Sequence, residues 1–364
     1  MPTTAPGRRP DDPTNGLLNL IVRLWYEDEL SQAAIGQALP KYGYPPRDQS
    51  TVSRYLQRAK TEGIIRIHIQ PPRLEALERR LKEKFSSKHL RDIVVVPGGS
   101  AEETLEHLGA HGAAILLDTL CSVMGPTIRL TLSCGTTVST VVQQFCDRLR
   151  RAPEVRRYLQ EKAWEIYPSH FLDEASFTNV HPLAQVATCA SLLTVYLAPK
   201  GDIKSTVLNL PPRFYSRPPQ ARMQFLRQNP QFWESIRQAK AAEIGLVGVG
   251  NLWDESGHLQ KRYAAVLQRL DPQLESTGEE YVAESDFIPL RADGTVHRCI
   301  ANKVVGVGLK GFRHMLQRPA PPTIIAMAGG QPKRRAVAAA LVKPYFNVLV
   351  TDETVARHLL QEPC

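Results

Sequence analysis

Strand-sized apolar runs alternate with helical stretches from about residue 89 to the end of the chain, and this alternation constrains the fold more than any other feature. Such runs are typical of strands that are buried on both faces. Their alternation with helices favours a parallel sheet covered by helices on both sides, which is an α/β architecture. The predicted strands are Ile93–Val96, Thr127–Ser133, Leu192–Leu197, Ile244–Val249, Val304–Leu309, Thr323–Ala328 and Asn347–Val350.

Composition and charge exclude several other classes. No apolar run reaches the ~18 residues that a membrane helix needs, and polar residues 1–15 lack the apolar stretch of a secretory signal, so we interpret them as a disordered tail. The six cysteines form no C-x-x-C pair, which favours a reducing cytoplasm and argues against a zinc ribbon; we expect no bound metal. The net charge of +9 suits an anionic partner.

Residues 16–70 have the order of a winged helix-turn-helix. Apolar residues recur at helical spacing between Leu17 and Trp25, and Ser31 is placed to cap a second helix. A third helix fits Gln49–Glu62, and apolar and polar residues then alternate over Ile65–Ile69, as in a strand.

The outer face of the predicted third helix carries arginines and short hydrogen-bonding groups, which a helix needs in order to read the major groove. Between Lys41 and Arg66 there are six basic residues and two acidic ones, and such a patch can neutralise phosphates. The alternative is a small amphipathic bundle with a solvated basic face. The predicted DNA contacts are Gln49, Ser50, Thr51, Ser53, Arg54, Arg58 and Arg66.

Residues 71–88 predict a charged amphipathic linker helix, and the α/β domain follows over residues 89–364. Leu74, Leu77 and Leu81 form the apolar stripe of the linker helix. A helix of this kind either pairs with a copy of itself or covers the next domain, and the sequence leaves both open.

Two strand-to-helix turns contain glycine and can bind an anion. In Ser133–Thr137, Gly135 allows a sharp turn, and the amides of the next helix with the hydroxyls of Thr136 and Thr137 can bind phosphate. In Ala328–Lys333, Gly330 allows close backbone approach and Lys333 adds a positive charge. Each turn alone is as consistent with an ordinary tight turn. Together they favour a ligand site, because ligands of open α/β sheets bind at the carboxyl ends of strands.

These segments resemble one family. Residues 29–36, 50–59 and 62–67 closely resemble the DNA-binding domain of the SorC family of bacterial sugar-responsive transcription regulators, apart from an enlarged turn at residues 40–47. Residues 133–137 match a Ser-Trp-Gly-x-Thr motif of that family with Cys134 in place of Trp. Further similar segments are residues 241–250, 284–287, 328–333 and 349–356, and the match is poor from Arg150 to Met223.

The resemblance implies a winged helix-turn-helix that binds double-stranded operator DNA, followed by a Rossmann-like α/β sensor domain with the fold of sugar-phosphate isomerases and coenzyme A transferases. It implies that the sensor binds a phosphorylated sugar without turning it over, and that the protein is a homodimer or homotetramer. No cofactor and no catalytic residue are expected. The predicted effector-binding residues are Gly135, Thr136, Thr137, Asp286, Gly330 and Lys333.

Two alternatives remain at this point. The first is an isomerase-type enzyme with an appended DNA-binding domain, for which Asp286 or Asp352 could serve as the general base. Asp352, however, precedes a helical stretch that it is placed to cap. The second is a DNA-binding regulator whose sensor has lost its ligand. Two departures from the family support this interpretation, namely Cys134 in place of Trp and Ser285 in place of the Gly of a Val-Gly-Asp-Ile segment.

Overall fold

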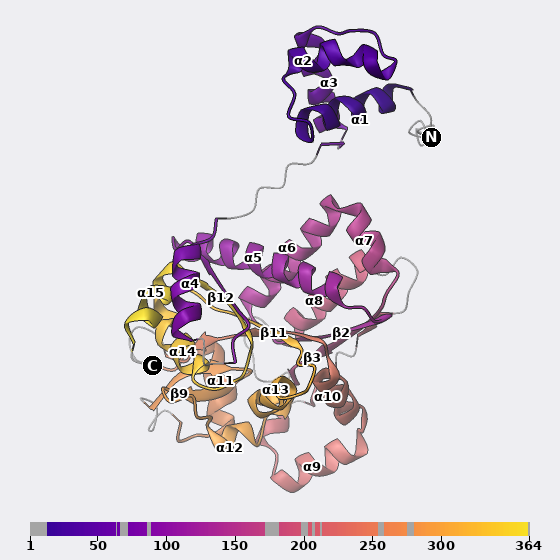
Figure 1. Ribbon diagram of the computed structural model, residues 1–364. Helices are drawn as coiled ribbons and strands as arrows, with labels where there is room; N and C mark the ends of the chain where they lie inside the picture. The colour runs from indigo at the N-terminus through magenta and orange to yellow at the C-terminus, as the bar shows by residue number, and fades with distance from the viewer. Residues whose placement is uncertain are drawn as a thin grey trace. The chain divides into compact units, whose positions relative to one another are not determined.

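The structure is a computed structural model, which describes residues 13–62, 64–65, 72–85, 89–171, 182–197, 203–205, 208–211, 213–253, 258–274 and 280–362. The chain divides into two compact units, Met1–Gln70 and Pro71–Cys364 (Figure 1). Of the predicted tail, residues 1–15, the first twelve lie outside the described residues. Its last three residues belong to helix α1, which begins at Pro13.

The N-terminal unit contains three α-helices among its described residues, α1 (Pro13–Tyr26), α2 (Gln32–Ala38) and α3 (Gln49–Thr61). The Ser31 hydroxyl caps α2 by accepting a hydrogen bond from the Ala34 amide at 3.2 Å, as predicted. Most of the predicted strand Ile65–Ile69 lies outside the described residues. The apolar stripes of the helices meet in one buried cluster of Leu17, Ile21, Leu24, Ile35, Leu39, Val52 and Leu56.

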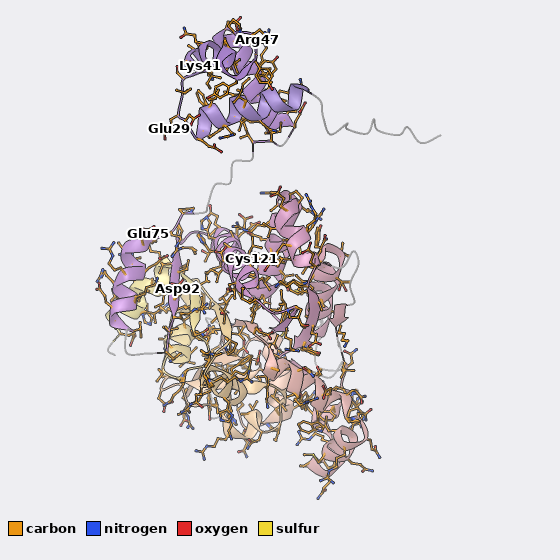
Figure 2. The ribbon with its side chains drawn as sticks, turned by 45° about the vertical axis from the view of Figure 1, so that its right-hand side comes forward. Glu29, Lys41, Arg47, Glu75, Asp92 and Cys121 are labelled. Carbon is orange, nitrogen blue, oxygen red and sulfur yellow. The ribbon has the colours of Figure 1, made fainter. Side chains whose placement is uncertain are left out.

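The enlarged turn between α2 and α3 has a defined conformation. The short helix η1 (Leu39–Tyr42) continues α2, and Gly43 ends it with a φ of +82°. The Arg47 amide then donates to the Gly36 carbonyl at 3.2 Å. A Cβ atom at Gly36 would lie 1.9 Å from the Arg47 carbonyl oxygen, so only glycine fits where these two segments of the backbone touch. Lys41 and Arg47 are both exposed on this turn (Figure 2).

The second unit is built on a seven-stranded sheet, and every pair of neighbouring strands in it is parallel. Strand burial is nearly complete because helices cover both faces. One buried apolar cluster lies on each face of the sheet. Successive residues of β1 alternate between these two clusters, with Ile93 and Val95 in one and Val94 and Val96 in the other. The strands in sheet order are β1 (Asp92–Val96), β12 (Val348–Asp352), β11 (Thr323–Met327), β6 (Ile244–Gly248), β2 (Thr127–Leu132), β3 (Ala163–Pro168) and β5 (Ile203–Ser205).

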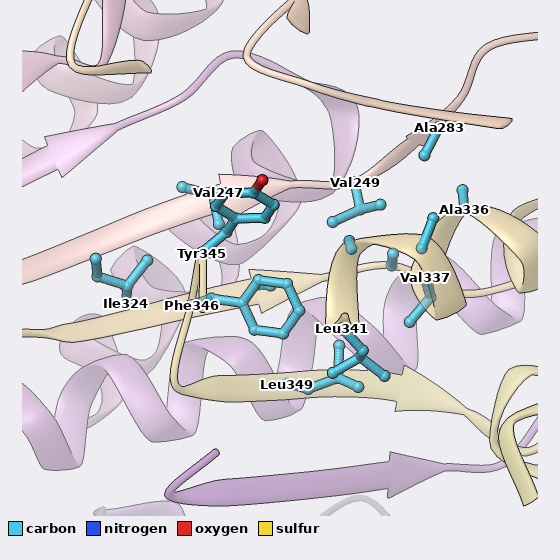
Figure 3. Packing of buried hydrophobic residues seen from close by; sticks show 14 of the residues in the cluster. Val247, Val249, Ala283, Ile324, Ala336, Val337, Leu341, Tyr345, Phe346 and Leu349 are labelled. Atoms are coloured by element: carbon cyan, nitrogen blue, oxygen red, sulfur yellow. The ribbon is translucent and has the colours of Figure 1, made fainter. Parts of the chain in front are cut away.

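Two helical layers sandwich this sheet (Figure 1). One cluster packs α5 (Ala101–Ser122), α6 (Thr136–Arg151), α7 (Pro153–Gln160) and α8 (Pro182–Leu197) against one face. The other packs α4 (Glu75–Lys84), α10 (Gln231–Ala241), α13 (Gly308–Leu316), α14 (Arg334–Leu341) and α15 (Glu353–Gln361) against the opposite face. Figure 3 shows the second cluster, in which Phe346 and Leu349 lie among Val247, Ile324 and Leu341.

Smaller elements lie beyond the carboxyl ends of the strands. A three-stranded antiparallel sheet contains β7 (Gly250–Asn251), β8 (Tyr281–Ser285) and β9 (Ile288–Arg291), and β4 (His170–Phe171) pairs with β10 (Val305–Gly306). A third apolar cluster lies under these elements. It includes residues of η3 (Phe214–Ser216), α9 (Pro219–Gln228), α11 (Lys261–Leu270) and α12 (Arg298–Ala301).

Two predicted strands are wrong. Leu192–Leu197 is the last part of α8, where Leu193 and Leu197 recur at a helical spacing of four and are buried. Val304–Leu309 is a two-residue strand followed by the start of α13, because Gly308, with a φ of +64°, turns the chain. Both runs are apolar enough for a strand but too short to show their period clearly.

The linker helix α4 covers its own domain. The amide of Leu74 donates to the Val95 carbonyl at 2.8 Å, and buried Glu78 accepts from the Val95 amide at 3.0 Å. Leu77 and Leu81 are buried in the cluster shared with α15 and β1. Of the two alternatives that the sequence left open, the helix therefore covers the next domain.

Candidate DNA-binding helix and effector site

Helix α3 begins at a cap that the chain itself supplies. The Asp48 carboxylate accepts from the Thr51 amide at 2.7 Å and from the Ser50 hydroxyl at 2.8 Å. These hydrogen bonds, led by the one from the Thr51 backbone, lower the pKa of Asp48, so the cap is ionised at neutral pH. The predicted start of the third helix at Gln49 is confirmed.

The predicted DNA contacts on α3 share one side of the helix. Val52, Leu56 and Ala59 are buried, whereas the opposite side carries exposed polar groups. Thr51 is half-buried, and Arg66 lies outside the described residues. The exposed contacts are Gln49, Ser50, Ser53, Arg54 and Arg58.

The two arginines of α3 have different partners. Arg54 donates from Nη2 to the Thr51 hydroxyl at 3.0 Å, and its charge helps to lower the pKa of Asp48. Arg58 donates from Nε to Glu62 at 2.7 Å and forms an i,i+4 ion pair. Arg54 donates to a hydroxyl and Arg58 to a carboxylate, so Arg54 gives up less when it turns toward DNA.

The predicted effector residues follow strands that end at the same edge of the sheet. Gly135 follows β2 and has a φ of +139°, and Gly330 follows β11 and has a φ of +91°. Strand β6 separates β2 from β11. Both positive φ values lie in a region that side chains rarely adopt, so both turns require glycine.

The hydroxyls and amine at these turns differ in exposure. Thr136 is exposed at the first position of α6, whereas Thr137 is buried, with 8% of its surface exposed. Of the two predicted threonines, only Thr136 is therefore exposed to solvent. Lys333 is half-buried at the end of η5 (Gln331–Lys333). A groove of about 400 Å³ lies beside this turn, lined by Gln331, Arg334, Glu353, Thr354, Arg357, His358 and Gln361.

A serine on each side links β6 to the neighbouring turns. The Gly248 amide donates to the Ser133 hydroxyl at 3.1 Å, and the Ser285 hydroxyl donates to the Gly248 carbonyl at 2.9 Å. Gly248 thus connects the turn after β2 with the turn after β8. Asp286 and Phe287, which form this second turn, have φ values of +50° and +61°.

Asp286 has buried partners that the sequence did not indicate. Its Oδ1 accepts from the Ser169 hydroxyl at 3.0 Å and lies 3.2 Å from His170 Nδ1. His170 Nε2 in turn lies 3.4 Å from the sulfur of Cys134. The cluster Cys134–His170–Asp286 therefore joins the β2 turn to the β8 turn, whereas Asp286 was predicted to bind sugar hydroxyls directly.

Charges within this cluster influence one another. Burial opposes a charge on His170, but Cys134 and the Asp286 carboxylate outweigh it and raise the pKa of His170 to about 10. Burial raises the pKa of the Cys134 thiol. At neutral pH the imidazole is a proton donor.

The chain resembles proteins of known class over almost its whole length. A family model described as "Putative sugar-binding domain" matches residues 182–361. The transcriptional regulator LsrR of Escherichia coli K12 is 23% identical over 346 residues, which cover 94% of this chain and 93% of that protein. LsrR of Klebsiella pneumoniae is 26% identical over 354 residues, which cover 92% and 90%.

Solved structures agree with this fold. The full-length sorbitol operon regulator SorC from Klebsiella pneumoniae superposes with a TM-score of 0.63 and 20% identity, covering 96% of this chain and 100% of that one. The chain is thus similar to LsrR over almost its whole length and has the fold of SorC. The helix-turn-helix and the α/β domain are the two compact units described above.

The part of the chain that the structure describes holds neither a metal-ligating cluster nor a membrane-spanning helix. The described residues contain no group of three or more His, Cys, Asp or Glu side chains arranged to hold a metal ion. No helix among the described segments is both long and apolar enough to span a bilayer. Ser169 and His170 were missed by the sequence analysis because a histidine outside any motif gives no signal of a partner 116 residues away.

Proposed function

We propose that this protein is a transcription regulator of the SorC family that binds double-stranded operator DNA through α3 and responds to a phosphorylated sugar at the carboxyl edge of its sheet. The observation that carries the proposal is the exposed polar and basic face of α3, on a helix with its own cap in a separate compact unit. The relatives named transcriptional regulator, which align with this chain over 90–93% of their own length, support it.

At the operator, Arg54 is the residue that reads a base. Its guanidinium is exposed and donates to the Thr51 hydroxyl, so little is lost when it turns toward guanine. Gln49, Ser50 and Ser53 flank it. Arg58 must leave Glu62 to reach DNA, and Arg66 contacts phosphates, so both contribute affinity more than specificity.

At the sheet edge, the effector's phosphate is bound by the first amides of α6 and by Lys333. A phosphate carries up to two negative charges at neutral pH, which suits amides at a helix start and one ammonium group. Gly135 and Gly330 keep the backbone free of a Cβ where the ligand approaches. Asp286 contributes by fixing His170 and Cys134 beneath this edge.

The isomerase alternative is disfavoured by the contacts of its two candidate general bases, Asp286 and Asp352. Asp286 is buried, and its Oδ1 accepts from the Ser169 hydroxyl and lies 3.2 Å from His170 Nδ1. Asp352 caps α15 through the Val355 amide, as predicted, and is 1% exposed. We therefore propose binding of the sugar phosphate without turnover, in the cytoplasm.

The protein acts as a homodimer or homotetramer. One helix-turn-helix gives limited contact area, and a two-fold axis places two α3 helices over half-sites one helical turn or a multiple apart. Effector binding changes operator affinity only if the two subunit arrangements bind the effector with different affinity.

Thermal unfolding of the purified full chain against a panel of phosphorylated sugars tests the effector arm. An effector at 100 times its dissociation constant stabilises the protein by about 2.7 kcal/mol, and the same sugars without phosphate serve as matched controls. The hit is then added to a gel shift on operator DNA, where a change in affinity supports the proposal. Operator binding with no stabilisation by any member identifies a regulator whose sensor has lost its ligand, and product release identifies the enzyme.

A further inference from the structure

Cys134, His170 and Asp286 form a buried line of three reactive side chains that direct binding of a phosphate does not require. The sulfur lies 3.4 Å from Nε2 of His170, whose Nδ1 lies 3.2 Å from Oδ1 of Asp286. His170 and Asp286 are 2% and 5% exposed, while Cys134 is half-buried. Cys134 is therefore the most exposed residue of the three.

The cluster contains one polar atom that nothing satisfies. Oδ1 of Asp286 accepts from Ser169, whereas Oδ2 is buried and has no hydrogen-bond partner among the described residues. A buried carboxylate oxygen without a donor costs free energy. The other acidic group near the thiol is Glu284, whose Oε2 accepts from the Phe287 amide. Oδ2 is thus available to a hydroxyl group brought by a ligand.

We propose that Cys134 is a covalent capture site, at which the thiol adds reversibly to the carbonyl carbon of a small hydroxyaldehyde. That the captured aldehyde belongs to the effector rests on the proposed function, but the reactivity of the thiol does not. The chemistry matches that of an open-chain aldose, which presents an aldehyde with hydroxyl groups beside it. A captured hydroxyl group can then donate to Oδ2 of Asp286.

The addition is balanced and needs no oxidant. A bond forms between the sulfur and the carbonyl carbon, and the π bond of the carbonyl breaks. The oxygen takes the proton from Nε2 of His170, and His170 takes the thiol proton back, so the product is a neutral hemithioacetal. Because His170 is protonated at neutral pH and is held by Asp286, it serves as the proton donor for this step.

The test measures how well glyceraldehyde protects each cysteine of the full chain from iodoacetamide, with glycerol as the control that lacks a carbonyl. Exposed Cys121 and Cys299 are references within the same molecule. Trypsin leaves Cys134 and Cys146 on one peptide, residues 130–148, so fragment-ion mass spectrometry assigns the label. Neither probe carries a phosphate and no operator is needed, so the result is independent of the proposed function.

We expect half-maximal protection of Cys134 at a glyceraldehyde concentration at least tenfold lower than for Cys121, and no protection by glycerol. His170→Gln keeps an N–H donor but cannot give up a proton, so protection of Cys134 should fall to that of Cys121. Equal protection of Cys134 and Cys121 in the unaltered chain would overturn the proposal, as would a Cys134 that iodoacetamide never labels. Undiminished protection in folded His170→Gln would remove His170 from the mechanism.

Discussion

The carboxylate of Asp352 holds the Gly330 turn to the end of strand β12. Its Oδ1 accepts hydrogen bonds from the Gly330 amide at 3.0 Å and from the Val355 amide at 3.3 Å. The second bond caps α15, and the first fixes the turn that we propose binds the effector. One buried side chain therefore links the stability of a helix to the shape of a ligand site.

Asp352→Ala should lower both thermal stability and effector affinity. Loss of the cap costs about 0.5–2 kcal/mol of stability, and the Gly330 amide loses its acceptor, which releases the turn. Asp48→Ala is the matched control, because Asp48 also caps a helix but in the other unit. It should weaken operator binding and leave calorimetric effector affinity unchanged. Equal effector affinity in both variants would show that Asp352 is only a cap.

Arg54→Ala should lower operator affinity by about 1–3 kcal/mol if the contact to guanine is bidentate. Specificity at one base pair should relax at the same time. Arg23→Ala is a suitable control, because Arg23 is an exposed arginine of α1 that pairs with Glu27. A gel-shift titration measures both. The same operator affinity for Arg54→Ala and the unaltered chain would contradict our assignment of the recognition helix.

Lys333→Ala should weaken effector binding by about 1.5–3 kcal/mol, the range for hydrogen bonds to charged groups. Operator binding without effector should not change. Arg335→Ala removes an exposed positive charge two residues away and should have a smaller effect. Isothermal titration calorimetry compares the two variants, and equal losses would mean that the turn contributes general charge and no specific contact.

The stability contributed by His170 should decrease as the pH rises. The pKa of His170 is raised to about 10 in the folded chain, against about 6.5 when unfolded. The contribution is therefore complete below about pH 6.5 and is lost as the pH approaches 10. The difference in melting temperature between the unaltered chain and His170→Gln should shrink over this range. A difference that is constant from pH 6.5 to 10 would argue for a neutral imidazole.

A fragment containing residues 71–364 should stay oligomeric and bind the effector. A fragment that begins at His89 should be much less stable, because it lacks Leu77 and Leu81. Burying each such side chain is worth about 1.5–3 kcal/mol. Light scattering and thermal unfolding check both fragments. A monomeric 71–364 fragment beside an oligomeric full chain would assign the assembly to the N-terminal unit.

Local patterns explain why much of the fold could be predicted. The run Ile93–Val96 is β-branched and bounded by a charge and a glycine turn, and it forms β1. Ser31 and Asp352 precede helices and cap them, because capping depends only on residues three positions away. The prediction of a strand at Leu192–Leu197 was wrong because its apolar residues suit a strand and a buried helix equally.

The cluster at the sheet edge could not be predicted in the same way. Cys134, His170 and Asp286 come together because the segments that follow β2, β3 and β8 meet in one region, and a single sequence does not give strand order. Thr137 stands beside Thr136 in the sequence, but the turn of α6 buries one and exposes the other. Turn types were predictable from glycine, whereas the partners of each side chain depend on contacts between distant segments.

The attachment of the linker segment to Val95 has a consequence for aggregation. Strand β1 is an edge strand of the seven-stranded sheet. An edge strand normally offers free amides and carbonyls to a strand from another molecule. Here the Leu74 amide and the Glu78 carboxylate occupy both backbone groups of Val95. These contacts at Val95 oppose edge-to-edge pairing of β1 with the sheet of a second copy of the protein.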